Sequence, residues 1–276
     1  MAEASAPRPT AAVLLIGNEL LSGKIRDENG WYLSRVCRRR GLTLREIAVV
    51  PDELDTIGEA LLRLLTSVPL VFTSGGVGPT HDDVTMAAIA RATGRRLIRD
   101  GQMEAILRQH YKGAAAEAAL RMAEIPEGTT LRALPGWPVM RLDLAAGEIF
   151  GARPPQPHDA RIYILPGIPA LLRAKIETLE GIPGELPPAR DWALVELHTS
   201  LDESALADRL DEVVADFADV EIGSYPSWIP DEGGRLRVRV KITFEASDAA
   251  RAQAARDALA DQLDPARLLP PPAPTS

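Results

Sequence analysis

The sequence contains very little cysteine. Among its 276 residues Cys37 is the single one, so no intramolecular disulfide bond can form. Nothing in the cysteine content therefore indicates an oxidising compartment. We interpret Cys37 as a residue that packs within a helix rather than as a nucleophile, because free cysteine is usually buried.

Long apolar runs are absent as well. Residues 1–9 include a glutamate and two prolines, and the apolar run that follows, 11–16, has only the length of a strand. We therefore expect no signal peptide, no membrane anchor and no membrane partner. The expected location is the cytoplasm.

An excess of basic residues is also missing, since the formal net charge is −8. A protein whose main partner is nucleic acid usually needs a net positive surface. We expect no nucleic-acid partner for this chain.

Familiar metal and nucleotide motifs are missing too. The sequence has no HExxH or CxxC, and its histidines show no metal-ligand spacing. The stretch 17–24 differs from a P-loop because five residues separate its glycines and no serine or threonine follows Lys24. The turn at 76–78 lacks the third glycine of a dinucleotide fingerprint. These absences argue against kinase-type phosphoryl transfer and against hydride transfer.

What the sequence does contain is an alternation of short apolar strands with helical patterns. We expect strands at 11–16, 42–50, 69–73 and 161–165, β structure with turns at 129–150, and helices at 31–40, 54–65, 84–93, 101–123 with a break at Gly113, and 170–179. Short connections between strand and helix imply right-handed crossovers and a parallel sheet. The predicted fold class is therefore α/β, a three-layer sandwich with a mostly parallel sheet.

A proline- and glycine-rich stretch at 181–188 is typical of a linker. We expect a first domain at 10–182, a smaller α+β domain at 190–264, and flexible tails at 1–9 and 265–276. The smaller domain is predicted to have strands at 192–199, 220–224 and 235–245 and helices at 202–217 and 248–263. Residues 235–242 alternate basic with aliphatic side chains, which is the ordinary pattern of a half-exposed strand.

The most informative stretch is 70–85, where an apolar strand ends in a turn that contains Gly75, Gly76 and Gly78. Glycines allow positive φ and a close approach of the backbone to a ligand. A helix is expected to begin near Val84, and the N–H groups at a helix start attract anions. The pattern therefore predicts a binding site for a phosphate group.

Two adjacent carboxylates, Asp82 and Asp83, follow this turn. Carboxylates repel phosphate unless a metal ion or a proton lies between them, so the pair indicates a metal. An alternative interpretation is that Thr80 and Asp83 only form a capping box at the helix start.

Two further loops, one after Gly17 and one after Pro166, also follow predicted strands of the sheet. Ligands of such sheets bind beyond the carboxyl ends of the strands, so the three loops can share one site. Glu19 and Asp27 would add carboxylates there, and hard divalent cations prefer oxygen ligands. A metal ion lowers the pKa of a bound water. The predicted chemistry is attack on a phosphoanhydride by water or by another phosphate.

The segments 17–29, 75–85 and 165–169 resemble the three signature loops of the molybdopterin-binding (MoaB/Mog-like) fold. The form they resemble most is that of CinA proteins and of the N-terminal module of eukaryotic FAD synthase. Residues 50–53, 137–139 and 223–228 favour the FAD-synthase branch. The smaller domain is similar to the KH-like domain that follows in CinA proteins.

This resemblance implies a reaction and a set of site residues. Relatives with this domain hydrolyse ADP-ribose or FAD with a divalent metal and release AMP. On that pattern Glu19, Asp82 and Asp83 would be the catalytic residues and would hold Mg²⁺, Mn²⁺, Co²⁺ or Ni²⁺. The remaining expected binding residues are Gly17, Asn18, Asp27, Asn29, Gly75, Gly76, Gly78, Pro79, Thr80, Thr85, Pro166, Gly167 and Pro169.

Within this set the turn 75–80 would hold the diphosphate, and Asp27 with Asn29 would position a ribose or the metal. Pro166, Gly167 and Pro169 would line the opposite wall. We expect a small-molecule nucleotide as the substrate and a homo-oligomer as the assembly, because closed homo-oligomers are common.

Two other functions remain open at this point. Mog-type relatives adenylylate molybdopterin, so the chain could be a molybdopterin-binding protein or an adenylyltransferase of molybdenum cofactor biosynthesis, although the KH-like domain counts against this. The third hypothesis is a nucleotide sensor or RNA-contacting module. The smaller domain has no evident Gly-x-x-Gly clamp, and the chain is acidic, which disfavours RNA.

Overall fold

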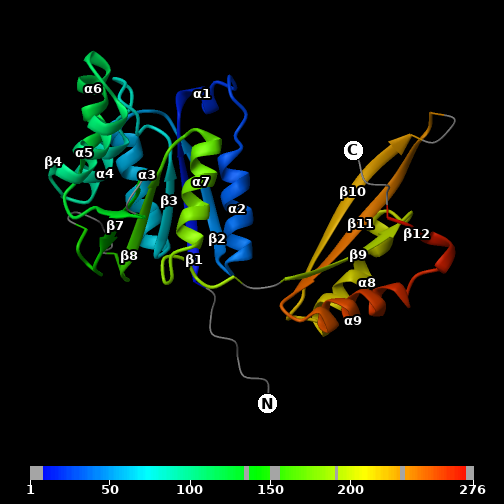
Figure 1. Ribbon diagram of the computed structural model, residues 1–276. Helices are drawn as coiled ribbons and strands as arrows, with labels where there is room; N and C mark the ends of the chain where they lie inside the picture. The colour runs from blue at the N-terminus through cyan, green and yellow to red at the C-terminus, as the bar shows by residue number, and fades with distance from the viewer. Residues whose placement is uncertain (1–8, 134–136, 150–155, 190–191, 231–233, 272–276) are drawn as a thin grey trace. The chain divides into compact units, whose positions relative to one another are not determined.

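The computed structural model describes residues 9–133, 137–149, 156–189, 192–230 and 234–271. The chain divides into two compact units, residues 1–189 and 190–276 (Figure 1). None of the described helices has the length and apolar content that a membrane crossing requires.

The first unit is built on a six-stranded sheet with the strand order β2-β1-β3-β8-β7-β6. In that order the strands are Thr43–Val50, Thr10–Ile16, Leu70–Ser74, Ala160–Leu165, Val139–Leu144 and Thr130–Arg132. The first four are parallel to one another, and β7 and β6 are antiparallel to their neighbours. The predicted mostly parallel sheet is confirmed.

The central strand β1 is buried on both faces, which explains its continuous apolar run. Ala12, Leu14 and Ile16 pack in one core, whereas Ala11, Val13 and Leu15 pack in the other. The first core contains α3 (Leu54–Ser67) and α4 (Thr85–Ala92), and the second contains α2 (Asn29–Arg39) and α7 (Pro169–Glu180). Figure 1 shows these two helix pairs on opposite faces of the sheet, so the three-layer arrangement is confirmed.

Cys37 lies fully buried on α2. Burial raises the pKa of its thiol to about 12. A thiol of that kind packs and does not supply a thiolate nucleophile.

The edge of the first unit differs in part from the prediction. The predicted break of the helical region 101–123 at Gly113 is confirmed, and the region consists of α5 (Gly101–His110), α6 (Ala114–Ala119) and the 3₁₀ helix η1 (Leu120–Ala123). A short helix, α1 (Asn18–Leu21), stands where a loop was predicted, and β4 (Leu97–Arg99) pairs with β5 (Glu124–Pro126), which was not predicted. Elements of three or four residues are too short to show a periodic pattern.

The second unit is a four-stranded antiparallel sheet with the order β10-β11-β9-β12 and two helices packed on it. Along the chain its elements are β9 (Ala193–Thr199), α8 (Glu203–Asp216), β10 (Glu221–Pro230), β11 (Leu236–Ala246), α9 (Ala249–Ala260), η2 (Pro265–Arg267) and β12 (Leu268–Leu269). The predicted alternation of β11 holds at Val240 and Ile242, which are buried, and at Lys241, which is half-exposed, but not at Leu236, which is 65% exposed at the start of the strand.

The expectation of a flexible tail at 265–276 is wrong for its first part. Leu268 and Leu269 form β12 and pair with β9, and the Arg239 guanidinium donates a hydrogen bond of 3.0 Å to the Pro270 carbonyl. The reason is that Leu268 packs against the core of the second unit. Residues 272–276, and residues 1–8 of the other predicted tail, lie outside the described part of the chain.

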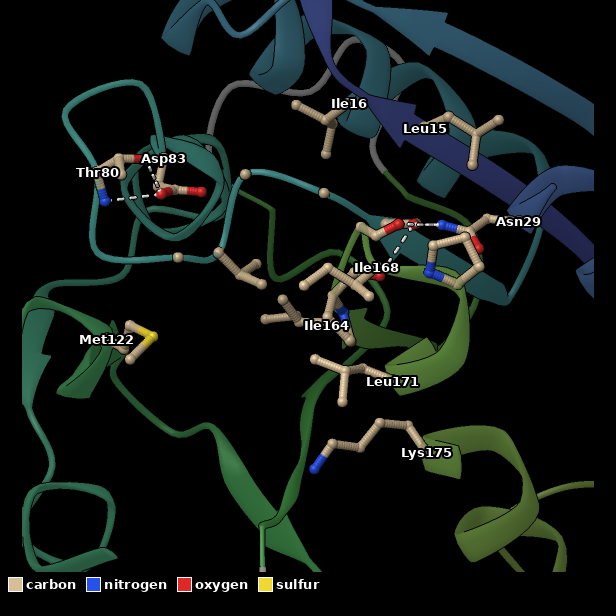
Figure 2. Close-up of a pocket in the computed structure, with 18 of the residues that line it drawn as sticks. Leu15, Ile16, Asn29, Thr80, Asp83, Met122, Ile164, Ile168, Leu171 and Lys175 are labelled. Carbon is tan, nitrogen blue, oxygen red and sulfur yellow. Dashed lines mark hydrogen bonds between the residues drawn. The ribbon is translucent and has the colours of Figure 1, made fainter. Parts of the chain in front are cut away.

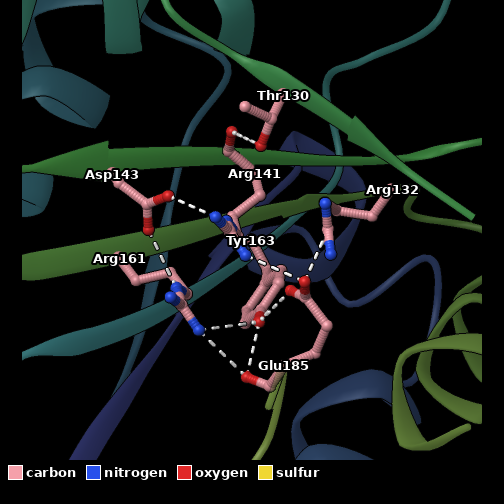
Figure 3. A network of polar contacts seen from close by, with 7 residues as sticks. All are labelled: Thr130, Arg132, Arg141, Asp143, Arg161, Tyr163 and Glu185. Carbon is pink, nitrogen blue, oxygen red and sulfur yellow. Dashed lines mark hydrogen bonds and ion pairs between the residues drawn. The ribbon is translucent and has the colours of Figure 1, made fainter. Parts of the chain in front are cut away.

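The segment predicted as a linker has no helix or strand, but Glu185 and Leu186 are buried. The Glu185 carboxylate accepts hydrogen bonds of 2.8 Å from the Tyr163 hydroxyl and from Arg141, and it also pairs with Arg132 (Figure 3). Burial alone would raise the pKa of Glu185, but the hydrogen bonds from Tyr163 and Arg141 outweigh it and lower that pKa. The linker interpretation is therefore wrong at Glu185 and Leu186, which are anchored to the first unit.

Candidate functional site

A cavity of about 910 Å³ lies in the first unit, where the carboxyl ends of β1, β3 and β8 meet (Figure 2). All three predicted loops contribute to its wall. The predicted residues that line it are Glu19, Asp27, Asn29, Gly75, Gly76, Gly78, Pro79, Thr80, Asp82, Asp83, Pro166, Gly167 and Pro169. Gly17, Asn18 and Thr85 are not part of the lining. A cavity of this volume is at the upper end for small-molecule sites and suits a ligand as large as a dinucleotide.

Asn29 joins the three loops, as Figure 2 shows. Its side-chain amide donates hydrogen bonds to the Ser74 hydroxyl at 3.0 Å and to the Gly167 carbonyl at 2.7 Å. The Asp27 carboxylate accepts from the backbone N–H groups of Asn29 and Gly30, at the start of α2. The contact of Asp27 and Asn29 with a ribose or a metal stays a prediction. In this structure Asp27 fixes the start of α2, and Asn29 links the loops.

The glycine turn has a shape that only glycine can adopt. Gly75 and Gly76 have φ values of 106° and 63°. A Cβ atom on Gly75 would overlap the Ile16 carbonyl oxygen, and one on Gly76 would overlap the Thr85 hydroxyl. Thr85 is buried and donates a hydrogen bond of 2.9 Å to the Gly75 carbonyl. Thr85 therefore shapes the turn instead of lining the cavity.

Three consecutive backbone amides of the turn have no acceptor among the described residues, whereas the Gly75 N–H donates to the Leu165 carbonyl. Within the described part of the chain, the amides of Gly76, Val77 and Gly78 make no hydrogen bond to the protein. Successive amides without an internal acceptor form a concave site that suits phosphate oxygens.

The capping-box interpretation is wrong. The Asp83 carboxylate accepts hydrogen bonds from the Thr80 N–H, at 2.8 Å, and from the Thr80 hydroxyl. However, α4 begins only at Thr85, and its N-cap residue, Val84, makes no side-chain capping bond. The Thr80–Asp83 bonds lie outside the helix and close the turn in front of it.

Four carboxylates line the cavity beside this turn: Glu19, Asp52, Asp82 and Asp83. Asp52 was not predicted as a site residue. It follows the carboxyl end of β2, so the strand-end rule could have found it. Its carboxylate accepts a hydrogen bond of 2.8 Å from the Asn18 N–H.

The charges of these carboxylates are not balanced. Burial, and then the negative charges of Glu19, Asp82 and Asp83, raise the pKa of Asp52 above its usual value. Polar contact with the Thr80 side chain, and then its own backbone N–H, lower the pKa of Asp82. A cation placed among these oxygens would relieve the repulsion that raises the pKa of Asp52.

The oxygen donors fit a hard divalent cation such as Mg²⁺ or Mn²⁺. The described residues contain no preformed group of three or more metal-ligating side chains. Mg²⁺ is usually held by one or two carboxylates together with substrate phosphates and water. These residues therefore suit a cation that arrives with a phosphorylated ligand.

The other end of the cavity is apolar and was not predicted. Trp137, Met140, Ile164 and Leu171 line it together with Lys175. Lys175 is 8% exposed, and burial lowers the pKa of its ammonium to about 8. The sequence pattern that could have identified Lys175 is its helical spacing from Leu172, Ile176 and Leu179, which form the buried face of α7.

Comparison with known proteins agrees with this geometry. The family model described as a probable molybdopterin binding domain matches residues 12–180. This chain belongs to the molybdopterin-binding domain family. The second unit of this family member matches a second model, described as the middle domain of FAD synthase, over residues 191–271.

Individual relatives of this molybdopterin-binding protein carry related descriptions. A probable FAD synthase from Caenorhabditis briggsae is 28% identical over 93% of this chain and 50% of its own length. A CinA-like protein from Frankia casuarinae is 31% identical over 88% of this chain and 55% of its own length. The chain therefore spans about half the length of these two relatives.

A solved relative supports the fold of the molybdopterin-binding unit. The crystal structure of the protein CinA from Thermoplasma acidophilum, described as having unknown function, is 30% identical. It covers 63% of this chain and 96% of its own, with a TM-score of 0.54.

Proposed function

We propose that this protein is a metal-dependent nucleotide pyrophosphatase that cleaves a dinucleotide-type diphosphate, of the FAD or ADP-ribose class, and releases AMP. The single observation that supports it most is the position of four carboxylates beside the unbonded amides of the glycine turn, in one cavity of dinucleotide size. The description of one relative as a probable FAD synthase supports a flavin dinucleotide as a member of the substrate class.

In this proposal the amides of Gly76, Val77 and Gly78 bind oxygens of the diphosphate and fix its position. Glu19 and Asp82 offer their oxygens to a divalent cation. Asp83 closes the turn through Oδ2 and leaves Oδ1 for the cation. The cation, when bound, neutralises the diphosphate and lowers the pKa of a coordinated water. Asn29 keeps the three loops at the distance that a single ligand can span.

The test is AMP release from FAD and from ADP-ribose in the presence of Mg²⁺, Mn²⁺, Co²⁺ or Ni²⁺. We expect Asp82→Asn to reduce the rate by roughly a hundredfold, which corresponds to about 2.7 kcal/mol of transition-state stabilisation. Asp55→Asn is the matched control, because Asp55 is paired with Arg91 on the surface and does not line the cavity. A control variant that loses activity as much as Asp82→Asn would contradict the assignment.

A second candidate function is adenylyl transfer to molybdopterin, or binding of molybdopterin without transfer. The family description favours it, and so does the apolar, aromatic end of the cavity, which suits a pterin ring. ATP consumption that depends on added molybdopterin, without AMP release from any dinucleotide, would favour this function over hydrolysis.

A further inference from the structure

Lys175 is a buried cation at the end of the cavity away from the carboxylates. Figure 2 shows it reaching from α7 toward the cavity, on a different side from Thr80 and Asp83. Its ammonium donates a hydrogen bond of 2.7 Å to the Pro138 carbonyl and a second one to the Trp137 carbonyl. An ammonium has three N–H donors, so one donor remains for a ligand.

Lys175 forms no ion pair with a carboxylate in the part of the chain that the structure describes. Its lowered pKa accordingly has burial as its cause, with no contribution from a neighbouring charge. Burial of an unpaired charge is costly, and buried charges are normally paired or bound to a ligand. Backbone carbonyls compensate this cost only in part. The buried ammonium of Lys175 therefore indicates a function in ligand binding.

The side chains around Lys175 are mostly aromatic or apolar. The Lys175 ammonium lies 5.9 Å from the centre of the Trp137 ring, and His110 packs edge-on against the same ring at 5.5 Å. Trp137 is 37% exposed, so part of its ring surface is open to a ligand. Met140 and Leu171 complete this part of the wall.

We propose that Trp137 and Lys175 form a ring subsite: a flat heteroaromatic ring packs against the indole, and a carbonyl oxygen on its edge accepts the free hydrogen bond of the ammonium. Flavin and pterin rings share this chemistry. The inference rests on the proposed function only in assigning the ring to the second half of the dinucleotide, the half that is not AMP. In that role Trp137 and Lys175 are specificity-determining residues that favour a ring-bearing dinucleotide over ADP-ribose, whose second half is a sugar.

The experiment measures equilibrium binding to the full chain in the presence of Mg²⁺, with ligands that carry a single phosphate and therefore have no diphosphate bond to hydrolyse. The ligands are riboflavin 5′-phosphate, a pterin monophosphate, ribose 5-phosphate and AMP. Binding is measured by calorimetry, and for the two ring ligands also by quenching of the ring's fluorescence. The variants are Lys175→Met, Lys175→Arg and Trp137→Leu. Lys112→Met is the matched control, because the exposed Lys112 also donates to a backbone carbonyl but does not line the cavity.

We expect Lys175→Met to weaken binding of the preferred ring ligand by roughly tenfold to a hundredfold, as the loss of a charged hydrogen bond does. Trp137→Leu should weaken it by roughly fivefold or more, through lost stacking. Binding of AMP should stay within about twofold of the wild type in every variant, which also shows that the variants are folded. Lys175→Arg should recover part of the loss, and Lys112→Met should change nothing. The ring ligand that shows this pattern, flavin or pterin, identifies the source.

Three results would overturn the subsite. They are ring binding that is unchanged in Lys175→Met, equal weakening of AMP and ring ligands, and a wild-type protein that binds neither ring. The outcome is separable from the pyrophosphatase proposal. If no dinucleotide releases AMP but ring binding still depends on Lys175, the proposed function fails and the subsite stands.

Discussion

At the scale of single residues, the carboxylates at the acidic end of the cavity lower the stability of the folded protein. Asp52 is held near three other carboxylates, and burial together with their charges raises its pKa. A carboxyl group with a raised folded-state pKa makes no unfavourable contribution below its unfolded pKa, near pH 4. It destabilises the folded protein as the pH rises through its folded pKa.

We therefore predict that Asp52→Asn raises the stability of the protein at pH 7. The gain should be about 1 kcal/mol or less, a rise in Tm of roughly 2–4 °C at most. It should shrink as the pH is lowered to about 3.5, where Asp52 is mostly protonated in both states. Thermal melts of both proteins between pH 3.5 and 8 measure the difference. A variant that is less stable than the wild type at pH 7 would contradict the electrostatic account.

At the scale of elements, the turn between β3 and α4 is fixed by backbone shape. Both Gly75 and Gly23 have positive φ, but only Gly75 is surrounded by other atoms. We predict that Gly75→Ala lowers the free energy of unfolding by about 3 kcal/mol or more, through φ strain and overlap with the Ile16 carbonyl. Gly23→Ala should cost only about 1 kcal/mol, the φ strain alone. Urea unfolding measures both, and equal costs would show that overlap at Gly75 is unimportant.

The segment 181–189, which contains the predicted linker and is called the strap below, is the second element whose role can be tested. Glu185 is 4% exposed and is held by Tyr163, Arg132 and Arg141. Removing one partner of a buried charged network leaves the others unpaired, so Glu185→Gln should cost about 2–4 kcal/mol at neutral pH.

The pH dependence of this cost follows from the lowered pKa of Glu185. A depressed folded-state pKa gives stability that is present above the unfolded pKa, near 4.5, and is lost as the pH falls through the folded pKa. The difference between wild type and Glu185→Gln should therefore shrink below about pH 4. The control is Glu127→Gln, which breaks an exposed pair with Arg96 and should leave the urea midpoint unchanged. A pH-independent cost at Glu185 would contradict a charged network.

At the scale of the whole molecule, the two units have separate cores, and every cavity-lining residue belongs to the first unit. We predict that a fragment of residues 1–189 folds and binds AMP within about threefold of the full chain. A fragment that ends at 182, the boundary expected from sequence, loses Glu185 and Leu186 and should unfold at a lower temperature. Thermal melts and AMP titrations of both fragments check this, and fragments of equal stability would contradict the anchoring role of the strap.

The sequence predicted much of the fold because the long elements have clear periods. β1 is a continuous apolar run since both faces of the sheet are covered, and three strand-end loops identified most of the cavity wall. It did not predict β4, β5 or β12, whose two or three residues carry no period. It also missed Trp137 and Lys175, because their place at the cavity depends on how β7 and α7 pack together, which no local pattern records. Asp52 was missed although it follows the carboxyl end of β2, where the strand-end rule applies.

The measurement that tests the central claim most directly is the product balance of FAD hydrolysis in ¹⁸O-labelled water, with the divalent metal present or removed. We predict equal amounts of AMP and riboflavin 5′-phosphate, one of them carrying the label, from the wild type only when the metal is present, with the yield strongly reduced in Asp82→Asn. AMP production by the wild type that does not exceed that of Asp82→Asn, for both FAD and ADP-ribose and with every metal, would contradict the proposed function.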